Sequence, residues 1–173
     1  MSLSMYAATL NPLRLMLKNL DVLLAKAEAQ VEAKKIEPNA FLHARLFPDM
    51  LNFTKQVQIA SDNAKGAAAR LAGVEIPRFE DTETTFAELH ERLARTLAFL
   101  DTLTEAQFEG AAGRRIELKQ RDRTLEMSGE EYLTTWALPN FFFHVTTAYA
   151  LLRHNGVEIG KTDYLRGAQL AGH

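Results

Sequence analysis

The chain has 173 residues, of which 47% are hydrophobic, so it carries enough apolar material for the core of one domain. Its formal net charge is −2 and its basic residues are scattered, which gives no electrostatic reason to expect nucleic acid as a partner. The lack of cysteine excludes disulfides, thiolate catalysis and cysteine-based zinc sites. We expect residues 1–173 to form a single domain.

A first amphipathic helix is predicted over residues 5–33, where leucines recur at steps of three and four residues. Pro12 lies inside this segment, so the helix either restarts there with Asn11 as its cap or kinks at the proline. Residues 34–40 are rich in polar residues and contain a proline, which predicts a loop.

A second helix is predicted to begin at Pro48, since proline is favoured in a first turn, with Asp49 complementing the helix dipole. Gly73 is a natural C-terminal stop. The apolar face is rich in alanine, so a neighbouring helix can approach it closely. Along the edge of that face, Asp49, Gln56 and Asn63 recur every seven residues and therefore lie on one line.

A third helix is predicted to start near Thr85, which has capping-box spacing with Glu88. After it, apolar and polar residues alternate over 114–127 on both sides of a polar turn at 120–123. This alternation predicts a small β-hairpin.

Ser128 and Glu131 repeat the capping-box spacing and open a fourth helix, which is predicted to continue to His154 and to be followed by a short tail. Pro139 cannot donate a backbone hydrogen bond, so we expect a kink or break there and a freed carbonyl near Thr135. Four long helices with a hairpin before the last one predict a mainly α protein, a four-helix bundle.

His144 is the candidate functional residue of the fourth helix. At roughly 100° per residue, it shares one side of the helix with Asn140 and Thr147. One interpretation is a buried polar network in which Asn140 or His144 satisfies the backbone freed at the proline. The other is a ligand pocket, completed from the second helix by the line that holds Gln56 and Asp49.

The other histidines give weaker signals. We expect His43 to be solvated in a loop, His90 to lie at the rim of the third helix's apolar stripe, and His154 to suit the negative end of its helix dipole. His173 is the last residue and is expected to be disordered. The di-iron site of some bundles needs paired E-x-x-H motifs, and no such motif occurs in the sequence.

The chain begins without a basic segment ahead of an apolar one, so no signal peptide is predicted. No apolar run approaches the roughly 20 residues that span a bilayer, and no basic amphipathic face suits a membrane surface. We therefore expect a cytoplasmic protein without a membrane partner.

Two stretches resemble a known family: PDMLNFTKQVQIASDNAKGAAARLAGVE (48–75) and LPNFFFHVTTAYALLRHNGVEIGKTDYL (138–165). They are similar to an uncharacterised bacterial domain family that is grouped with the DinB-like, YfiT-like superfamily of helical bundles. The resemblance extends over about residues 3–165. It implies a four-helix bundle, often dimeric, and in many superfamily members a divalent metal held by one histidine of the second helix and an H-x-x-x-H pair on the fourth. Some of those members are metal-dependent thiol transferases or hydrolases.

The ligand set carries over in part. His144 matches the second histidine of the pair, but Asn140 stands four residues before it. The second helix has no histidine; Gln56 is the best match there, with Asp49 and Asp62 as alternatives. One histidine beside amide oxygens is a poor set for zinc or nickel. We expect no cofactor, with a divalent metal on His144 as the alternative.

Three hypotheses follow, and none of them names a substrate. The first is a DinB-like bundle whose degenerate metal site serves a structural or small-ligand-binding role. The second is a divalent-metal-dependent transferase or hydrolase that uses His144 and a carboxylate, Asp49 or Asp62. The third is a dimeric interaction protein, and a homodimer is compatible with either of the first two.

Overall fold

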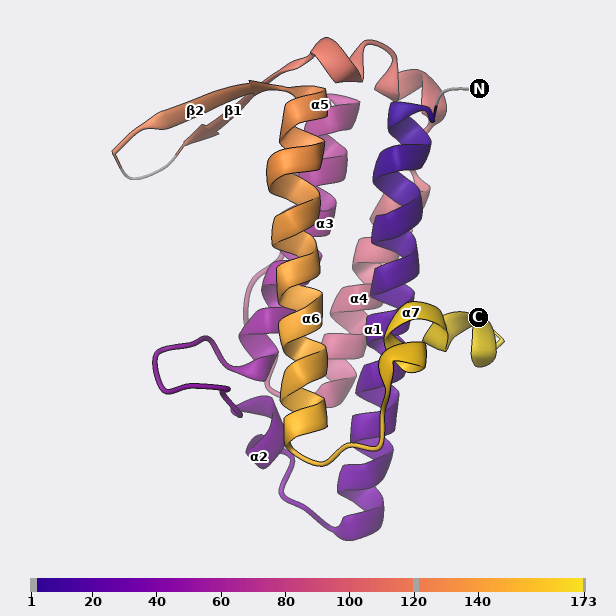
Figure 1. Cartoon of the computed structure of the whole chain (residues 1–173), viewed down its shortest axis with the longest axis vertical. Coiled ribbons are helices and arrows are strands. Elements are labelled where there is room, and N and C mark those ends of the chain that lie inside the picture. Colours follow the sequence, from indigo (N-terminus) through magenta and orange to yellow (C-terminus); the bar gives the residue numbers. More distant parts are fainter. Residues whose placement is uncertain (1–2, 120–121, 173) are drawn as a thin grey trace.

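The bundle consists of four long helices in the computed structural model, which describes residues 3–119 and 122–172 (Figure 1). They are α1 (Met5–Lys34), α3 (Phe53–Ala72), α4 (Phe86–Asp101) and a last helical run made of α5 (Gly129–Glu131), the π-helical η3 (Tyr132–Ala137) and α6 (Leu138–His154). The predicted mainly α four-helix bundle is confirmed. No helix in these described ranges is both long enough and apolar enough to cross a membrane.

Helices α1 and α6 run in one direction, and α3 and α4 both run in the opposite direction, as the colours of Figure 1 show. Because α3 and α4 are parallel neighbours, the connection over residues 74–85 must return the chain along the length of the bundle. Lys55 and Gln58 of α3 hold this connection at Asp81 and Glu83, and Ser61 of α3 contacts Thr96 of α4.

Helix α1 runs without interruption through Pro12, so the alternative of a restart at Asn11 is wrong. Ser4 caps the helix by accepting from Ala7 N at 3.2 Å. A proline inside a helix costs about 3 kcal/mol, whereas each fully buried leucine contributes about 1.5–3 kcal/mol. The buried stripe therefore outweighs the proline; its leucines are Leu10, Leu13, Leu17, Leu20, Leu23 and Leu24.

Helix α3 begins at Phe53 and not at Pro48, which corrects the predicted start. Asn52 is the cap, and its side chain accepts from Lys55 N at 3.0 Å. Residues 43–52 form a loop, which follows a short helix, α2 (Asn39–Leu42), whose first residues lie in the segment predicted as a loop. The end of α3 is as predicted, because Gly73 adopts the left-handed conformation (φ 71°).

The hairpin pairs β1 (Arg115–Lys119) with β2 (Thr124–Ser128) in antiparallel register, which confirms that prediction. Short 3₁₀ turns, η1 (Glu105–Phe108) and η2 (Ala111–Gly113), lead into it from α4. The far end of the hairpin projects away from the bundle (Figure 1). Residues 120–121 of the predicted turn, and His173, lie outside the described residues.

The break predicted at Pro139 is a widened turn, the π-helical stretch η3, immediately before α6. A wider turn keeps the carbonyl four residues back clear of the proline ring. Thr134 and Thr135 donate their hydroxyls to the carbonyls of Glu130 (2.8 Å) and Glu131 (2.7 Å). The threonines thus supply hydrogen bonds to the backbone where the helix changes type.

The predicted short tail is a helix, α7 (Lys161–Leu170), that packs on α1 (Figure 1). The fully buried amide of Asn19 holds it: Nδ2 donates to Tyr164 O and Oδ1 accepts from Ala168 N, both at 2.9 Å. A Cβ at Gly167 would already touch Val22, so the two helices lie close together.

Candidate functional site

A hydrogen bond between His144 and Gln56 joins α6 to α3. His144 Nδ1 lies 2.7 Å from Gln56 Oε1. The Gln56 amide is oriented by its other end, because Nε2 donates to Leu51 O at 3.1 Å. Its oxygen therefore faces the imidazole, and Nδ1 must be the donor. In the neutral ring the lone pair is then on Nε2.

The surroundings of His144 favour this neutral ring. His144 is only 9% exposed to solvent, and Gln56 is 2% exposed. Burial lowers the pKa of His144 below its ordinary value, since the imidazolium would lose its hydration. Among the described residues, Nε2 of His144 has no hydrogen-bond partner and is not one of the completely buried side-chain atoms that lack one, so it retains some exposure. Nε2 is free to accept a hydrogen bond.

The residues one turn to either side of His144 do not extend the hydrogen bond into a network. Thr147 is buried, but its hydroxyl donates to the Phe143 carbonyl at 2.7 Å. Asn140 is half-buried. In the described part of the chain neither Asn140 nor His144 hydrogen-bonds to the backbone before Pro139; His144 directs Nδ1 to Gln56. The exposed ring of Phe143 stands edge-on to the imidazole, 5.2 Å between centroids.

The carboxylates weighed as partners lie elsewhere. Asp49 is exposed in the loop before α3, because the helix starts after it, so Asp49 is not on the helical line of Gln56. Asp62 is on α3 but faces α4: it pairs with Arg92 of α4 and with Lys65 of its own helix, both at 2.8 Å. The structure brings Gln56 to His144 and brings neither aspartate.

These residues do not fit a divalent metal site of the kind that the resemblance implies. Zinc sites use at least three protein ligands of nitrogen, sulfur or carboxylate oxygen. His144 offers one nitrogen, and Gln56 already directs its amide oxygen to Nδ1. Over residues 3–119 and 122–172, no three histidine, aspartate or glutamate side chains gather in a way that could hold a metal. No chemistry is therefore assigned to a metal at His144.

Arg92 is a buried residue that sequence reasoning missed. Its side chain pairs with three carboxylates: Asp62 at 2.8 Å, Asp81 at 3.0 Å and Glu83 at 2.8 Å. Asp81 and Glu83 belong to the 74–85 connection, so Arg92 fastens that connection to α3 and α4. A signal was available, since Arg92 follows the buried Leu89 by three residues and therefore shares its helix face.

His90 lies at the edge of α4, as expected. Its Nδ1 is 2.5 Å from Asp21 and its Nε2 is 3.5 Å from Glu28, both on α1. The hydrogen bond to Asp21, helped by the charges of Asp21 and Glu28, raises the pKa of His90. When His90 is protonated, it is a charged link between α1 and α4. His43 and His154 are exposed.

Together, the bundle and the hairpin before its last helix define a DinB-like helical protein, in which His144 faces α3. A family model described as a domain of unknown function, DUF1993, matches residues 5–165. The chain is similar to a DinB family member protein from Shewanella denitrificans whose crystal structure is known. The two sequences are 45% identical, the TM-score is 0.84, and the match covers 92% of this chain and 90% of that one. No curated protein matches. The chain belongs to the DUF1993 family, and its predicted resemblance is confirmed.

Proposed function

We propose that this DinB-like protein keeps its degenerate metal position as a hydrogen-bonded pair, His144–Gln56, which ties α6 to α3 and presents Nε2 of His144 to a small ligand. The observation that carries the proposal is the 2.7 Å contact from Nδ1 to Oε1, together with the Leu51 carbonyl that orients the amide. The Gln56 amide oxygen accepts a hydrogen bond from the imidazole ring and is therefore not directed at a metal ion.

The structural half of this role rests on burial. Because Gln56 is almost fully buried, deleting the imidazole leaves its amide oxygen without a partner. A buried polar group left unpaired costs about 1–3 kcal/mol. We therefore expect the pair to stabilise the contact between α3 and α6 by an amount of that order.

The ligand half rests on the lone pair of the neutral ring. Nε2 can accept a hydrogen bond from an O–H or N–H group, while the ring of Phe143, 55% exposed, offers an apolar surface beside it. A small molecule with a hydrogen-bond donor next to an apolar group matches these two features. Protonation of His144 would remove the acceptor, so binding weakens at low pH.

Metal analysis and one variant pair test the proposal. We expect freshly purified protein to contain no stoichiometric transition metal, and we expect Zn²⁺, Ni²⁺ or Mn²⁺ not to raise its melting temperature, since only binding to the native state stabilises it. His144→Ala should lower the free energy of unfolding by about 1–3 kcal/mol. His154→Ala, an exposed histidine of the same helix, is the matched control and should change little. Bound metal that is lost in His144→Ala, or equal stability of both variants, would refute the proposal.

A homodimer is the second proposed function, favoured by exposed aromatic rings. Phe143 and Trp136 are seven residues apart on the last helical run, and Phe47 of the loop before α3 is 63% exposed. Large exposed apolar side chains are typical of protein–protein contact sites. We expect light scattering at micromolar concentration to give the dimer mass, and Phe143→Ser to weaken the dimer while Leu170→Ser, on α7, does not. A monomer at that concentration contradicts the proposal.

A further inference from the structure

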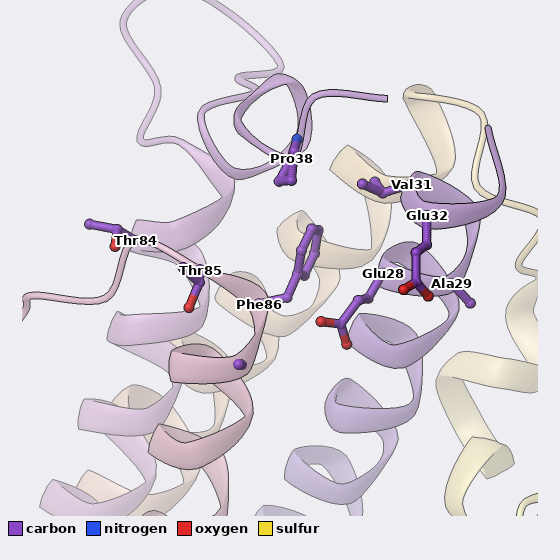
Figure 2. Close-up of a pocket in the computed structure, with 9 residues that line it drawn as sticks. Glu28, Ala29, Val31, Glu32, Pro38, Thr84, Thr85 and Phe86 are labelled. Carbon is purple, nitrogen blue, oxygen red and sulfur yellow. The ribbon is translucent and has the colours of Figure 1, made fainter. Parts of the chain in front are cut away.

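A pocket of about 360 Å³ opens between the C-terminal half of α1, the start of α4 and Pro38 (Figure 2). Its walls come from α1 and α4, whereas the His144–Gln56 pair lies between α3 and α6. Small-molecule sites are typically concave and about 300–1,000 Å³ in volume. The pocket is thus large enough for a compact ligand.

The lining of the pocket has an acidic side and an apolar side. Glu28 and Glu32 are four residues apart on α1 and therefore share one face. Figure 2 shows their carboxylates across the pocket from the Phe86 ring. Phe86 and Val31 are buried in the core beneath it, which makes this surface rigid. The combination suits a ligand with a charged end and an apolar body.

In residues 3–119 and 122–172, no lysine or arginine forms an ion pair with either carboxylate. Among the ion pairs of the described residues, Glu28 has one partner, His90, at 3.5 Å from its Oε2, and Glu32 has none. The α4 N-terminus also borders the pocket, and a free helix N-terminus would attract anions. Here a capping box lies in front of it: Glu88 N donates to Thr85 Oγ1, and the Glu88 carboxylate accepts from Thr84 N and Thr85 N, which adds a negative charge at this helix end. The remaining charge of the pocket is negative.

We propose that this pocket binds a compact organic cation, an ammonium or guanidinium group on a short apolar or aromatic body. The cation meets Glu28 and Glu32, and the body packs on Phe86 and Val31. An aromatic ring within reach of a cation adds a further attraction. This site is separate from the His144–Gln56 pair and goes beyond the proposed function.

His90 gives the site a second readout. Glu28 faces the pocket and also lies 3.5 Å from His90, which pairs with Asp21 on α1. Glu91, the next residue of α4, lines the adjoining hollow together with His90 and Asp21. A bound cation and the His90 proton are therefore both attracted to Glu28 and disfavour each other. By linkage, a saturating cation lowers the pKa of His90, and raising the pH above that pKa tightens cation binding.

Calorimetric titration with benzylamine tests the proposal, with benzyl alcohol and benzoate as neutral and anionic molecules of similar shape. We expect benzylamine to bind and the other two to bind at least about tenfold more weakly, because two carboxylates each contribute roughly 1 kcal/mol. Glu28→Gln and Glu32→Gln should each weaken benzylamine binding about fivefold. Glu130→Gln, an exposed glutamate of α5, carries the same change of charge and should have no effect.

Each outcome decides the matter. No binding of benzylamine up to about 10 mM, equal binding of the three molecules, or unchanged affinity in both pocket variants would overturn the proposal. The comparison of the three molecules uses the unaltered chain, so it holds even where a variant folds poorly. The histidine NMR signal of His90 must move to a lower titration midpoint in saturating benzylamine; an unmoved midpoint shows that the cation binds outside this pocket.

Discussion

Replacing Arg92 by alanine should destabilise the protein more than any single loss of an exposed charge. Its guanidinium is buried, and it bridges Asp62, Asp81 and Glu83. Removing one partner of a fully buried pair costs about 3–5 kcal/mol, because the other charge stays uncompensated. Here Asp62 and Asp81 are part-exposed and can be hydrated, and Glu83 is the carboxylate that stays buried, 9% exposed. The expected cost is therefore at the lower end, about 3 kcal/mol.

Urea unfolding followed by circular dichroism measures this cost, with Arg95→Ala as control. Arg95 is exposed and lies over the same ring, Phe79, as Arg92, but it makes no ion pair among the described residues. We expect Arg95→Ala to change the free energy of unfolding by about 0.5 kcal/mol. Adding Glu83→Gln to Arg92→Ala should recover part of the loss, since the buried charge is gone. A loss below about 1 kcal/mol for Arg92→Ala, or strict additivity of the double variant, would refute the reasoning.

Two further predictions concern other contacts between elements. Because Asp21 raises the folded-state pKa of His90, this pair stabilises the fold fully below the unfolded pKa of about 6.5 and the contribution is lost as the pH rises through the folded pKa. Thermal melts from pH 5 to 9 should show this decline, and Asp21→Asn should reduce it to the smaller part that Glu28 supplies; a variant with the same profile contradicts the link. Gly129 packs so closely that an added Cβ would lie 1.9 Å from the Ala111 carbonyl, so Gly129→Ala should cost about 1–3 kcal/mol in urea unfolding, whereas Gly113→Ala, with open space around it, should cost little. Equal effects of the two glycine variants would contradict this packing.

Features set by local chemistry could be predicted from the sequence. The start of α4 depends on Thr85 and Glu88, three residues apart, and the end of α3 on Gly73, which adopts the conformation that only glycine takes at little cost. The hairpin follows from alternation over a few residues. The start of α3 was misplaced, because Pro48 permits a first turn whereas the Asn52 side chain makes the capping bond.

Features that depend on contacts between residues far apart in the sequence could not be predicted from local patterns. Helix α7 depends on the Asn19 amide, about 145 positions away, and Arg92 depends on a connection that wraps along the bundle. The contact between His144 and Gln56 could be predicted. The helical projection placed His144 on the inward side of its helix, and the seven-residue spacing placed Gln56 along the edge of the second helix's apolar face. Asp49 was wrongly placed on that line because its membership depended on the misplaced helix start.

The protonation state of the His144 ring tests the central claim most directly. Two-dimensional ¹H–¹⁵N NMR of the side chain distinguishes Nδ1–H from Nε2–H and follows the titration. We predict a neutral ring protonated on Nδ1, a titration midpoint below the ordinary value of about 6.5, and no change when Zn²⁺ is added at equal concentration. In Gln56→Leu the preference for Nδ1–H should disappear. A ring protonated on Nε2, or a zinc-induced shift of its nitrogen signals, would contradict the account.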